Sequence, residues 1–484
     1  MYHSTRGKDL YTSKEALIKG LADDKGLFVV DKIPHFMLKE KDMNISYKDL
    51  AKQIFKLYFD DFTDEELDEV VSLYNSENFP YGQTKLSGTT DYAFLELYLG
   101  PTFAFKDMAL TVLPKLIEIA KRSKKDSKKT VVLTATSGDT GSAALAGFSK
   151  NESNYIVVLY PDGKTSMIQE AQMLSFKNDH AFPVAVKGTF DDCQRIVKKI
   201  FNQEDYSNLD LISANSINIG RLIPQIVYYY AGYCNLVQRD FILYGEKINI
   251  VVPTGNFGNI LAATLASKMG LPVNKIVCAS NENKVLTDFF NTGIYDANRE
   301  FIQTNSPAMD ILVSSNLERF LYFIYKDSQK ITEIESQLEN NGKFEIPLED
   351  IKKVFPNFVA GYATKGETID NICKSFKQNK ILIDPHTAVA YKVYNDLKND
   401  LDNCFTMIVS TASPYKFSNT VSDALGLNGN TEKDRIDAIY HKSGKKIDNR
   451  LYDYLFQEHD REVIDLDHTY GYIKKLLGDL NDKD

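Results

Sequence analysis

The stretch that decides the fold is "TVVLTATSGDTGSAALAGFS", residues 130–149. It begins with β-branched and apolar residues typical of a buried strand, passes through a polar loop with two glycines, and ends in a helix pattern of mostly small residues. A strand that runs into a helix through such a loop is the repeating unit of an α/β sheet. The stretch therefore predicts a largely parallel, buried sheet with helices on its faces.

The same alternation of short strand runs and longer helix patterns extends to both sides of this stretch. A second series begins at residue 248, so the simplest architecture is two open α/β domains with a cleft between them. Helix patterns dominate the N-terminal part, where Thr63 stands ahead of acidic residues as a helix N-cap does. The expected strands are 91–99, 130–135, 155–160, 182–188, 248–254, 275–280, 381–384 and 405–413. The expected domains are a mostly helical N-terminal domain at 1–90, a first α/β domain at 91–245, a second at 246–430 and a helical C-terminal extension at 431–484.

Composition excludes several classes of protein. The 484 residues carry a net charge of -9, which argues against a nucleic-acid surface because neutralising phosphates takes an excess of Lys and Arg. The five cysteines form no CxxC pair, which suits a reducing compartment and no metal site. No stretch reaches the ~18 apolar residues of a membrane span, and the N-terminus lacks the apolar core of a signal peptide. We expect a cytoplasmic monomer or weak dimer with no nucleic-acid or membrane partner.

Ligands of open α/β sheets bind beyond the carboxyl ends of the strands, and the loop within 134–145 is the first such end. Its hydroxyls, two glycines and free N–H groups at a helix start suit a carboxylate or a phosphate. The alternative is a helix capped by Ser137 or Asp139, with the glycines needed only for packing.

A second strand end lies within 251–263, where Gly255 and Gly258 flank Asn256 and Phe257. Successive backbone N–H groups in such a loop can line a phosphate at the positive end of a helix. The loop has neither Walker A nor GxGxxG spacing, and an ordinary strand–helix turn is its alternative.

The third strand end follows 405–410, where Thr411 offers a hydroxyl that can bond a buried heteroatom of a ligand; ordinary turn chemistry is the alternative. Upstream, Lys106 ends the apolar run "PTFAFKD" (101–107) and is either a surface charge or a reactive amine. Neighbours such as Phe103 and Phe105 would lower the pKa of an amine by desolvation. A lysine, a phosphate loop, an anion loop and a hydroxyl together match the needs of pyridoxal phosphate.

Eight blocks of sequence, in order along the chain, resemble the threonine synthase family in its bacterial and fungal subgroup. The blocks are "GLADDKGLFVVDKIP" (20–34), "LELYLGPTFAFKDMAL" (95–110), "TATSGDTGSAA" (134–144), "SANSINIGRLIPQIVYYY" (213–230), "VPTGNFGNILAA" (252–263), "SPAMDILVSSNLERFL" (306–321), "DPHTAVAY" (384–391) and "STASPYKF" (410–417). The resemblance implies a fold-type II pyridoxal-phosphate enzyme that converts O-phospho-L-homoserine and water to L-threonine and phosphate.

Matching motifs imply a role for each residue of the site. Lys106 would carry the cofactor as a Schiff base and act as catalytic acid and base, and Thr411 would face the pyridine nitrogen. The residues implied to hold the cofactor phosphate are Gly255, Asn256, Phe257, Gly258 and Asn259. The residues implied to form the substrate loop are Thr136, Ser137, Gly138, Asp139, Thr140 and Gly141.

The substrate's own phosphate needs a separate cationic site, and we assign it to Arg221 with Asn218, near the start of a helix pattern. A structural ion pair of Arg221 is the alternative. His386 is interpreted as a capping or packed side chain rather than an acid or base. Ser413 stands where the family often has His.

Two other functions remain compatible with the sequence. A related phospholyase of the same fold would release a 2-oxo acid from nearly the same residues. A non-catalytic binding protein would use the glycine loops for a nucleotide or another anion, and it would be colourless.

Overall fold

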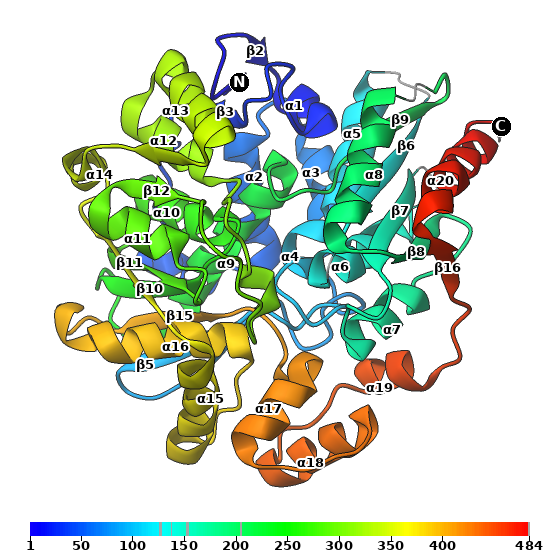
Figure 1. Cartoon of the computed structure of the whole chain (residues 1–484). Coiled ribbons are helices and arrows are strands. Elements are labelled where there is room, and N and C mark those ends of the chain that lie inside the picture. Colours follow the sequence, from blue (N-terminus) through cyan, green and yellow to red (C-terminus); the bar gives the residue numbers. More distant parts are fainter. Residues whose placement is uncertain (125–127, 137, 152–153, 204–205, 483–484) are drawn as a thin grey trace.

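Two sheets, each covered by helices, make up most of the molecule (Figure 1), which is a computed structural model that describes residues 1–124, 128–136, 138–151, 154–203 and 206–482. This arrangement confirms the predicted α/β class. Among the described residues, no helix is long and apolar enough to cross a membrane.

The larger sheet has six strands in the order β14-β11-β10-β15-β5-β4. All neighbouring strands run parallel except β4 and β5, which pair antiparallel at one edge. The central strands are almost entirely buried, as expected of a parallel sheet covered on both faces. The strands are β4 (Lys85–Gly88), β5 (Tyr92–Glu96), β10 (Ile248–Pro253), β11 (Val273–Ser280), β14 (Phe358–Tyr362) and β15 (Thr406–Ser410).

The second sheet has five parallel strands in the order β16-β8-β7-β6-β9. Its strands are β6 (Lys129–Ala135), β7 (Asn154–Pro161), β8 (Ala181–Lys187), β9 (Leu209–Ile212) and β16 (Glu462–Asp465). Two small antiparallel sheets complete the strands; they are formed by β1 (Tyr2–Ser4), β2 (Leu10–Tyr11) and β3 (Phe28–Val30), and by β12 (Ile294–Asp296) and β13 (Lys343–Glu345).

The N-terminal segment is mostly helical, and Thr63 caps its last helix, α3, as predicted, by accepting a hydrogen bond from the backbone N–H of Glu66. Its helices are α1 (Ser13–Lys19), η1 (Glu40–Asp42), α2 (Tyr47–Tyr58) and α3 (Asp64–Val71). The helices around the five-stranded sheet and between the sheets are α4 (Asp107–Leu110), α5 (Leu113–Ser123), α6 (Asp139–Phe148), α7 (Met167–Ser175), α8 (Phe190–Gln203) and α9 (Ile219–Gln238).

The remaining helices follow β10 in the chain. Those before β15 are α10 (Gly258–Met269), α11 (Val285–Thr292), η2 (Pro307–Met309), α12 (Leu317–Tyr325), α13 (Ser328–Asn341), α14 (Leu348–Val354), α15 (Lys365–Asn379), α16 (Pro385–Leu397) and η3 (Lys398–Asp400). Those after it are η4 (Pro414–Phe417), α17 (Ser418–Leu425), α18 (Glu432–Ser443), α19 (Asn449–Phe456) and α20 (Leu466–Asn481).

Helix α9 is central to the packing. It is apolar on nearly all sides and buried along most of its length, as a helix inside a large core is. It contacts α2 of the N-terminal segment, α10 behind the larger sheet, and α4 next to Lys106. The first turn of α9, which holds Arg221, is therefore fixed by several parts of the chain at once.

The strands depart from the expectation in several places, and neither β4 nor β9 was expected. β5, expected with the first α/β domain, pairs with β15 in the larger sheet. β16 lies inside the expected helical extension and pairs with β8. Residues 381–384 form no strand, and Asp384 caps α16; the neighbour of β11 is β14, which was not expected.

Candidate active site

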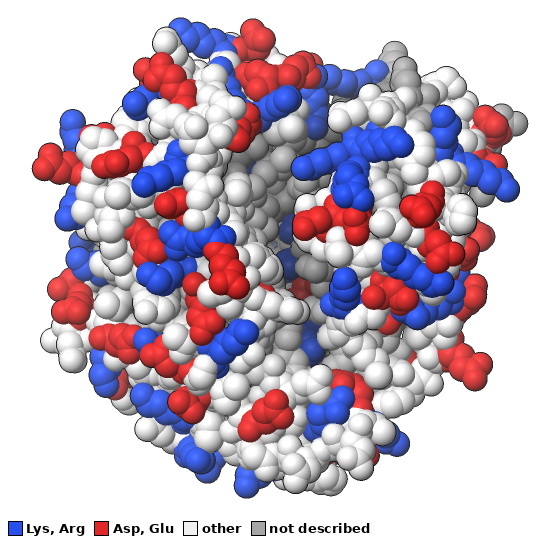
Figure 2. All heavy atoms as spheres, in the orientation of Figure 1, with Lys and Arg blue, Asp and Glu red and all other residues white. Residues whose placement is uncertain are grey.

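A cavity of about 420 Å³ lies where the three predicted strand-end loops meet. It is lined by residues after β6, β10 and β15, together with Lys106 and the first turn of α9. Figure 2 shows this face hollowed at its centre, with Lys and Arg atoms visible inside the hollow. The volume is ordinary for a site that binds a small molecule.

The segment that carries Lys106 is held against the loop after β15 by backbone hydrogen bonds. The N–H of Phe105 donates to the carbonyl of Thr411 at 2.8 Å, and the N–H of Ser413 donates to the carbonyl of Phe103 at 3.0 Å. Phe103 takes a left-handed φ of 58°, which a bulky residue adopts only where its surroundings impose it. Lys106 and Thr411 are therefore placed together by the main chain.

Lys106 lies half-buried at the wall of the cavity, and no described side chain forms an ion pair or hydrogen bond with its Nζ. Burial lowers the pKa of Lys106 to about 8, against the opposing effect of the nearby Asp139 carboxylate. Burial also raises the pKa of the next residue, Asp107, to about 6, while its carboxylate accepts from the N–H and hydroxyl of Thr102 at 2.8 and 2.6 Å. Near neutral pH the Lys106 amine is therefore present in both its protonated and its neutral form.

The loop after β10 presents unpaired N–H groups to the cavity. No described residue accepts from the backbone N–H of Gly255, Asn256, Phe257 or Gly258, and all four line the cavity. Phe257 is left-handed with φ 64°, and its buried ring stacks on aromatic neighbours behind the sheet. Asn259 accepts from two tyrosine hydroxyls, while its Nδ2 is buried without a partner.

Asn316 supports this loop from behind, and the sequence did not single it out. Its backbone N–H and its Nδ2 both donate to the carbonyl of Asn256, at 3.1 and 2.9 Å, and Nδ2 also donates to Ser216 Oγ at 3.2 Å. Its Oδ1 accepts from the fully buried Arg319, which in turn donates to the carbonyls of Phe28 and Ile217. One asparagine thus joins the loop after β10 to the segment before α9.

The loop after β6 is tied together by Thr136. Its hydroxyl accepts from the N–H groups of Gly138 and Gly141 at 3.1 and 3.0 Å. No described residue outside α6 accepts from the N–H of Asp139 or Thr140, which line the cavity. Ser137, predicted as part of this loop, lies outside the described residues.

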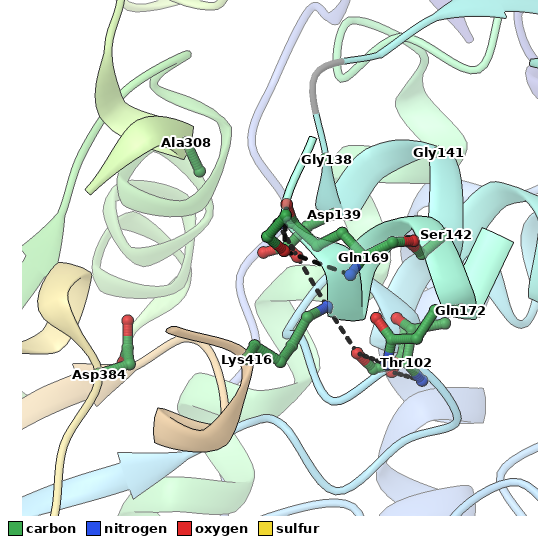
Figure 3. A network of polar contacts seen from close by, with 12 residues as sticks. Thr102, Gly138, Asp139, Gly141, Ser142, Gln169, Gln172, Ala308, Asp384 and Lys416 are labelled. Atoms are coloured by element: carbon green, nitrogen blue, oxygen red, sulfur yellow. Dashed lines mark hydrogen bonds and ion pairs between the residues drawn. The ribbon is translucent and has the colours of Figure 1, made fainter. Parts of the chain in front are cut away.

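The Asp139 side chain is turned to an ion pair with Lys416 (Figure 3). Lys416 Nζ lies 2.6 Å from Asp139 Oδ1, and Gln169 Nε2 donates to the same oxygen at 2.8 Å. Although burial alone would raise it, the charges of Lys416 and Lys106 hold the pKa of Asp139 below its usual range. Sequence reasoning assigned no role to Lys416, although it lies in the block at 410–417, or to Gln169, which lies in α7.

Arg221 is the second cation at the cavity, 4% exposed. Its Nη1 donates to the carbonyl of Ala214 at 2.5 Å, its Nε has no partner, and no described carboxylate pairs with it. Burial lowers the pKa of Arg221 to about 10. The alternative of a structural ion pair therefore has no support among the residues described.

Asn218, predicted beside Arg221, does not line the cavity. Its Oδ1 accepts from the N–H of Gly220 at 2.8 Å and its Nδ2 donates to the carbonyl of Leu17 at 2.9 Å, so it caps α9 and anchors it to α1. The geometry does not support direct contact of Asn218 with a ligand.

His386 lines the cavity with both ring nitrogens occupied. Nδ1 lies 2.8 Å from Asp384 Oδ1, and Nε2 accepts from the N–H of Ala308 at 3.2 Å. These bonds fit the interpretation of His386 as a packed side chain. Ser413 does not line the cavity, whereas Thr411 does, and no described residue bonds its hydroxyl.

Three family models match the chain. They are described as "Threonine synthase N terminus" at residues 1–73, "Pyridoxal-phosphate dependent enzyme" at 82–409 and "Threonine synthase, C-terminal" at 387–448. Threonine synthase of Saccharomyces cerevisiae is 36% identical over 472 residues, which cover 90% of this chain and 91% of the yeast protein. The chain belongs to the threonine synthase family. The family predicted from the sequence blocks is thereby confirmed.

Solved structures of this family have the same fold. The crystal structure of threonine synthase from yeast matches with a TM-score of 0.89 and 32% identity, covering 99% of both chains. The pyridoxal-phosphate-bound threonine synthase from Brucella melitensis matches with a TM-score of 0.87 and 29% identity, covering 98% of both. The expected fold-type II architecture is confirmed.

Longer relatives of the threonine synthase family also match. The protein called threonine synthase-like 1 of Homo sapiens is 39% identical over 434 residues, which cover 85% of this chain. The chain spans only 58% of the length of that relative.

The cavity fits the cofactor of the family. Pyridoxal phosphate has an aldehyde, a phosphate and a ring nitrogen. Lys106 offers an amine, four N–H groups lie at the start of α10, and Thr411 offers a hydroxyl, none of which has a partner among the described residues. The buried, unpartnered Nδ2 of Asn259 is a further donor beside the N–H groups.

Proposed function

We propose that this protein converts O-phospho-L-homoserine and water to L-threonine and phosphate. The observation that carries the proposal is Arg221, a buried guanidinium that lines the cavity without a carboxylate partner among the described residues. A buried charge without a partner is costly, so such a site is built for an anionic ligand. A cavity with one anion site at 255–259 and another at Arg221 suits a cofactor and a substrate that each carry a phosphate.

In this proposal the cofactor is held at three points. Lys106 binds its aldehyde, residues 255–259 hold its phosphate through N–H groups at the start of α10, and Thr411 donates to its ring nitrogen. When bound, the cofactor takes up the negative charge that develops on substrate carbons as protons leave them. A hydroxyl such as that of Thr411 favours an unprotonated ring nitrogen, which moderates this capacity.

Lys106 is the proposed acid and base. Once the substrate amine has replaced Lys106 at the aldehyde, a pKa of about 8 would let the freed Nζ accept the proton from the α-carbon and deliver protons further along the substrate. Over the whole reaction the C–O bond to phosphate breaks at Cγ, Cβ loses a proton and gains the hydroxyl of a water, and Cγ gains a proton. The second proton of the water leaves with the phosphate. No net oxidation or reduction takes place.

The remaining residues of the site bind and orient the substrate in this proposal. The free N–H groups of Asp139 and Thr140 at the start of α6 receive its carboxylate. Arg221 grips its phosphate, with the unpartnered Nε as one donor. Asn218 acts indirectly, by capping α9 and so fixing the turn that carries Arg221.

Two measurements test the proposal. The purified protein should absorb visible light, and borohydride trapping followed by peptide mass mapping should place the cofactor on Lys106; a label on another lysine overturns the site. Incubation with O-phospho-L-homoserine should release threonine and phosphate in equal amounts, followed by NMR. Release of 2-oxobutyrate instead would identify a phospholyase, and no turnover by a coloured protein would refute this substrate.

We further propose the cytoplasm as the location, since all five cysteines are free, as they are in a reducing compartment. We propose a monomer or weak dimer as the oligomeric state. Sedimentation at micromolar concentration tests it, and a stable tetramer would contradict it.

A further inference from the structure

The ion pair between Asp139 and Lys416 is buried more deeply than any other Lys–Asp pair described, with side chains 5% and 0% exposed. Lys416 belongs to η4, directly after the loop that carries Thr411, and Asp139 begins α6. Lys416 Nζ also donates to the carbonyl of Thr102 at 2.7 Å, just upstream of Lys106 (Figure 3). One ammonium thus joins the segments that carry Thr411, Asp139 and Lys106.

Only one partner of this pair borders the cavity. Asp139 lines it, whereas Lys416 does not, so the carboxylate is the member of the pair that borders a ligand. Gln172 Nε2 donates to the same Thr102 carbonyl at 3.2 Å, and Gln169 completes the shell of Asp139. These hydrogen bonds hold the carboxylate and the ammonium in a single arrangement.

Stability alone does not account for such a pair. Taking two charges out of water costs several kcal/mol, and an apolar pair of similar volume is often as stable. The Asp139 carboxylate also lies at the start of α6, beside the N–H groups of Asp139 and Thr140 that can bind an anion. Without a cation next to it, this carboxylate would repel the anion.

Four charged groups face Lys106 and together determine how the ion pair affects its charge state. They are the carboxylates of Asp139 and Asp107 and the cations Arg221 and Lys416. Asp107 is fixed by Thr102, and Arg221 lies on α9. Lys416 is the cation that directly contacts Asp139, so it offsets the carboxylate charge at the shortest range.

We propose that Lys416 is a positioning residue of the reaction: it holds the Asp139 carboxylate against the wall of the cavity and cancels its charge toward Lys106 and the substrate carboxylate. Lys416 touches neither cofactor nor substrate. The inference rests on the proposed function only in taking Lys106 as the lysine that binds the cofactor.

The proposal predicts the direction in which three variants shift the midpoint of the pH titration of visible absorbance. Lys416→Met leaves Asp139 unpaired, so its negative charge stabilises a proton on Lys106 Nζ and the titration midpoint rises. Asp139→Asn leaves Lys416 unpaired, and the midpoint falls. The double variant removes both charges, and its midpoint returns to that of the unmodified protein. A purely structural pair would lower stability in each variant without this order of midpoints.

The test is a pH titration of the visible absorbance of the holoenzyme for the four proteins, between about pH 5 and 11. We expect the midpoint of Lys416→Met to lie about one unit or more above that of the double variant, and the midpoint of Asp139→Asn to lie below it. Equal midpoints, or a double variant whose midpoint stays with Lys416→Met, overturn the proposal. Absence of a transition in Lys416→Met, when the other proteins show one, also overturns it.

Two further variants separate charge from folding. Lys416→Arg keeps the charge and should keep the midpoint, and the double variant, which has no unpaired buried charge, keeps the titration measurable if Lys416→Met fails to fold. Lys445→Met is the matched control, because Lys445 donates to Tyr98 at 2.8 Å outside the cavity lining. A shift in Lys445→Met as large as in Lys416→Met would refute a specific role. The titration needs no turnover, so it stands even if the product is a 2-oxo acid.

Discussion

Replacing Arg221 with Met tests the second anion site. The change removes a cation that is 4% exposed and has no described carboxylate partner, and it keeps most of the side-chain volume. If Arg221 grips the substrate phosphate, the variant loses charge-assisted hydrogen bonds worth about 3 kcal/mol. The KM for O-phospho-L-homoserine should then rise by about 100-fold.

The same substitution has a predicted effect on stability. Burial lowers the pKa of Arg221 from its usual value to about 10, so the folded state disfavours the charged form by about 3 kcal/mol at any pH below the folded pKa. The variant escapes this cost and loses only the hydrogen bond to the Ala214 carbonyl and some packing. We therefore expect a melting temperature for the substrate-free variant that does not fall.

The assay is the initial rate of phosphate release against substrate concentration, together with thermal unfolding and the cofactor spectrum. Arg221→Lys should recover part of the affinity, because it restores the charge but not the planar fork. Arg122→Ala, which removes an exposed arginine paired with Glu69, is the control and should change neither KM nor spectrum. An unchanged KM in Arg221→Met refutes the assignment, and a sharp fall in melting temperature would indicate a structural ion pair instead.

Two other predictions follow from the geometry. Asn316→Ala should weaken cofactor binding about tenfold, as measured by fluorescence titration, and lower the melting temperature, because the Asn256 carbonyl loses one of its two bonds and Arg319 loses its amide partner. Asn305→Ala is the control, because Asn305 bonds the carbonyl of Lys365 and does not line the cavity. Unchanged binding in Asn316→Ala would contradict the supporting role. Since only the neutral amine attacks an aldehyde, the rate at which apo-protein takes up cofactor should rise with pH and be half-maximal near the Lys106 pKa of about 8; a rate that is flat from about pH 6 to 9 would show that this amine is not the attacking group.

The strand-end loops were predictable because each is a local pattern. A β-branched run, glycines and a small-residue helix fall within about twenty residues at 130–149, and the sheet then brings such ends together. Lys106 was ambiguous by itself, and it was identified only because the three strand-end loops occur in the same chain. The structure adds the backbone bonds that place it beside Thr411.

The partners of these loops were not predictable from local pattern. Lys416 and Asp139 lie far apart in the chain, and neither residue type signals an ion pair before the fold is known. Asn218 has the right residue type for a ligand contact, yet its amide is used to cap α9. Strand β16 was hidden because its four residues lie within a segment of strong helical periodicity.

The order of strands in the two sheets constrains how the nascent chain can fold on the ribosome. Strand β5 pairs with β15, so Tyr92–Glu96 waits for Thr406–Ser410 to be synthesised, and the edge of β8 stays open until Glu462–Asp465 emerges. The larger sheet is therefore incomplete until residues 406–410 are made and the smaller one until residues 462–465 are made, and an open strand edge is a template for pairing with another molecule. Binding by a chaperone during synthesis would protect the edge of β8 until residues 462–465 pair with it.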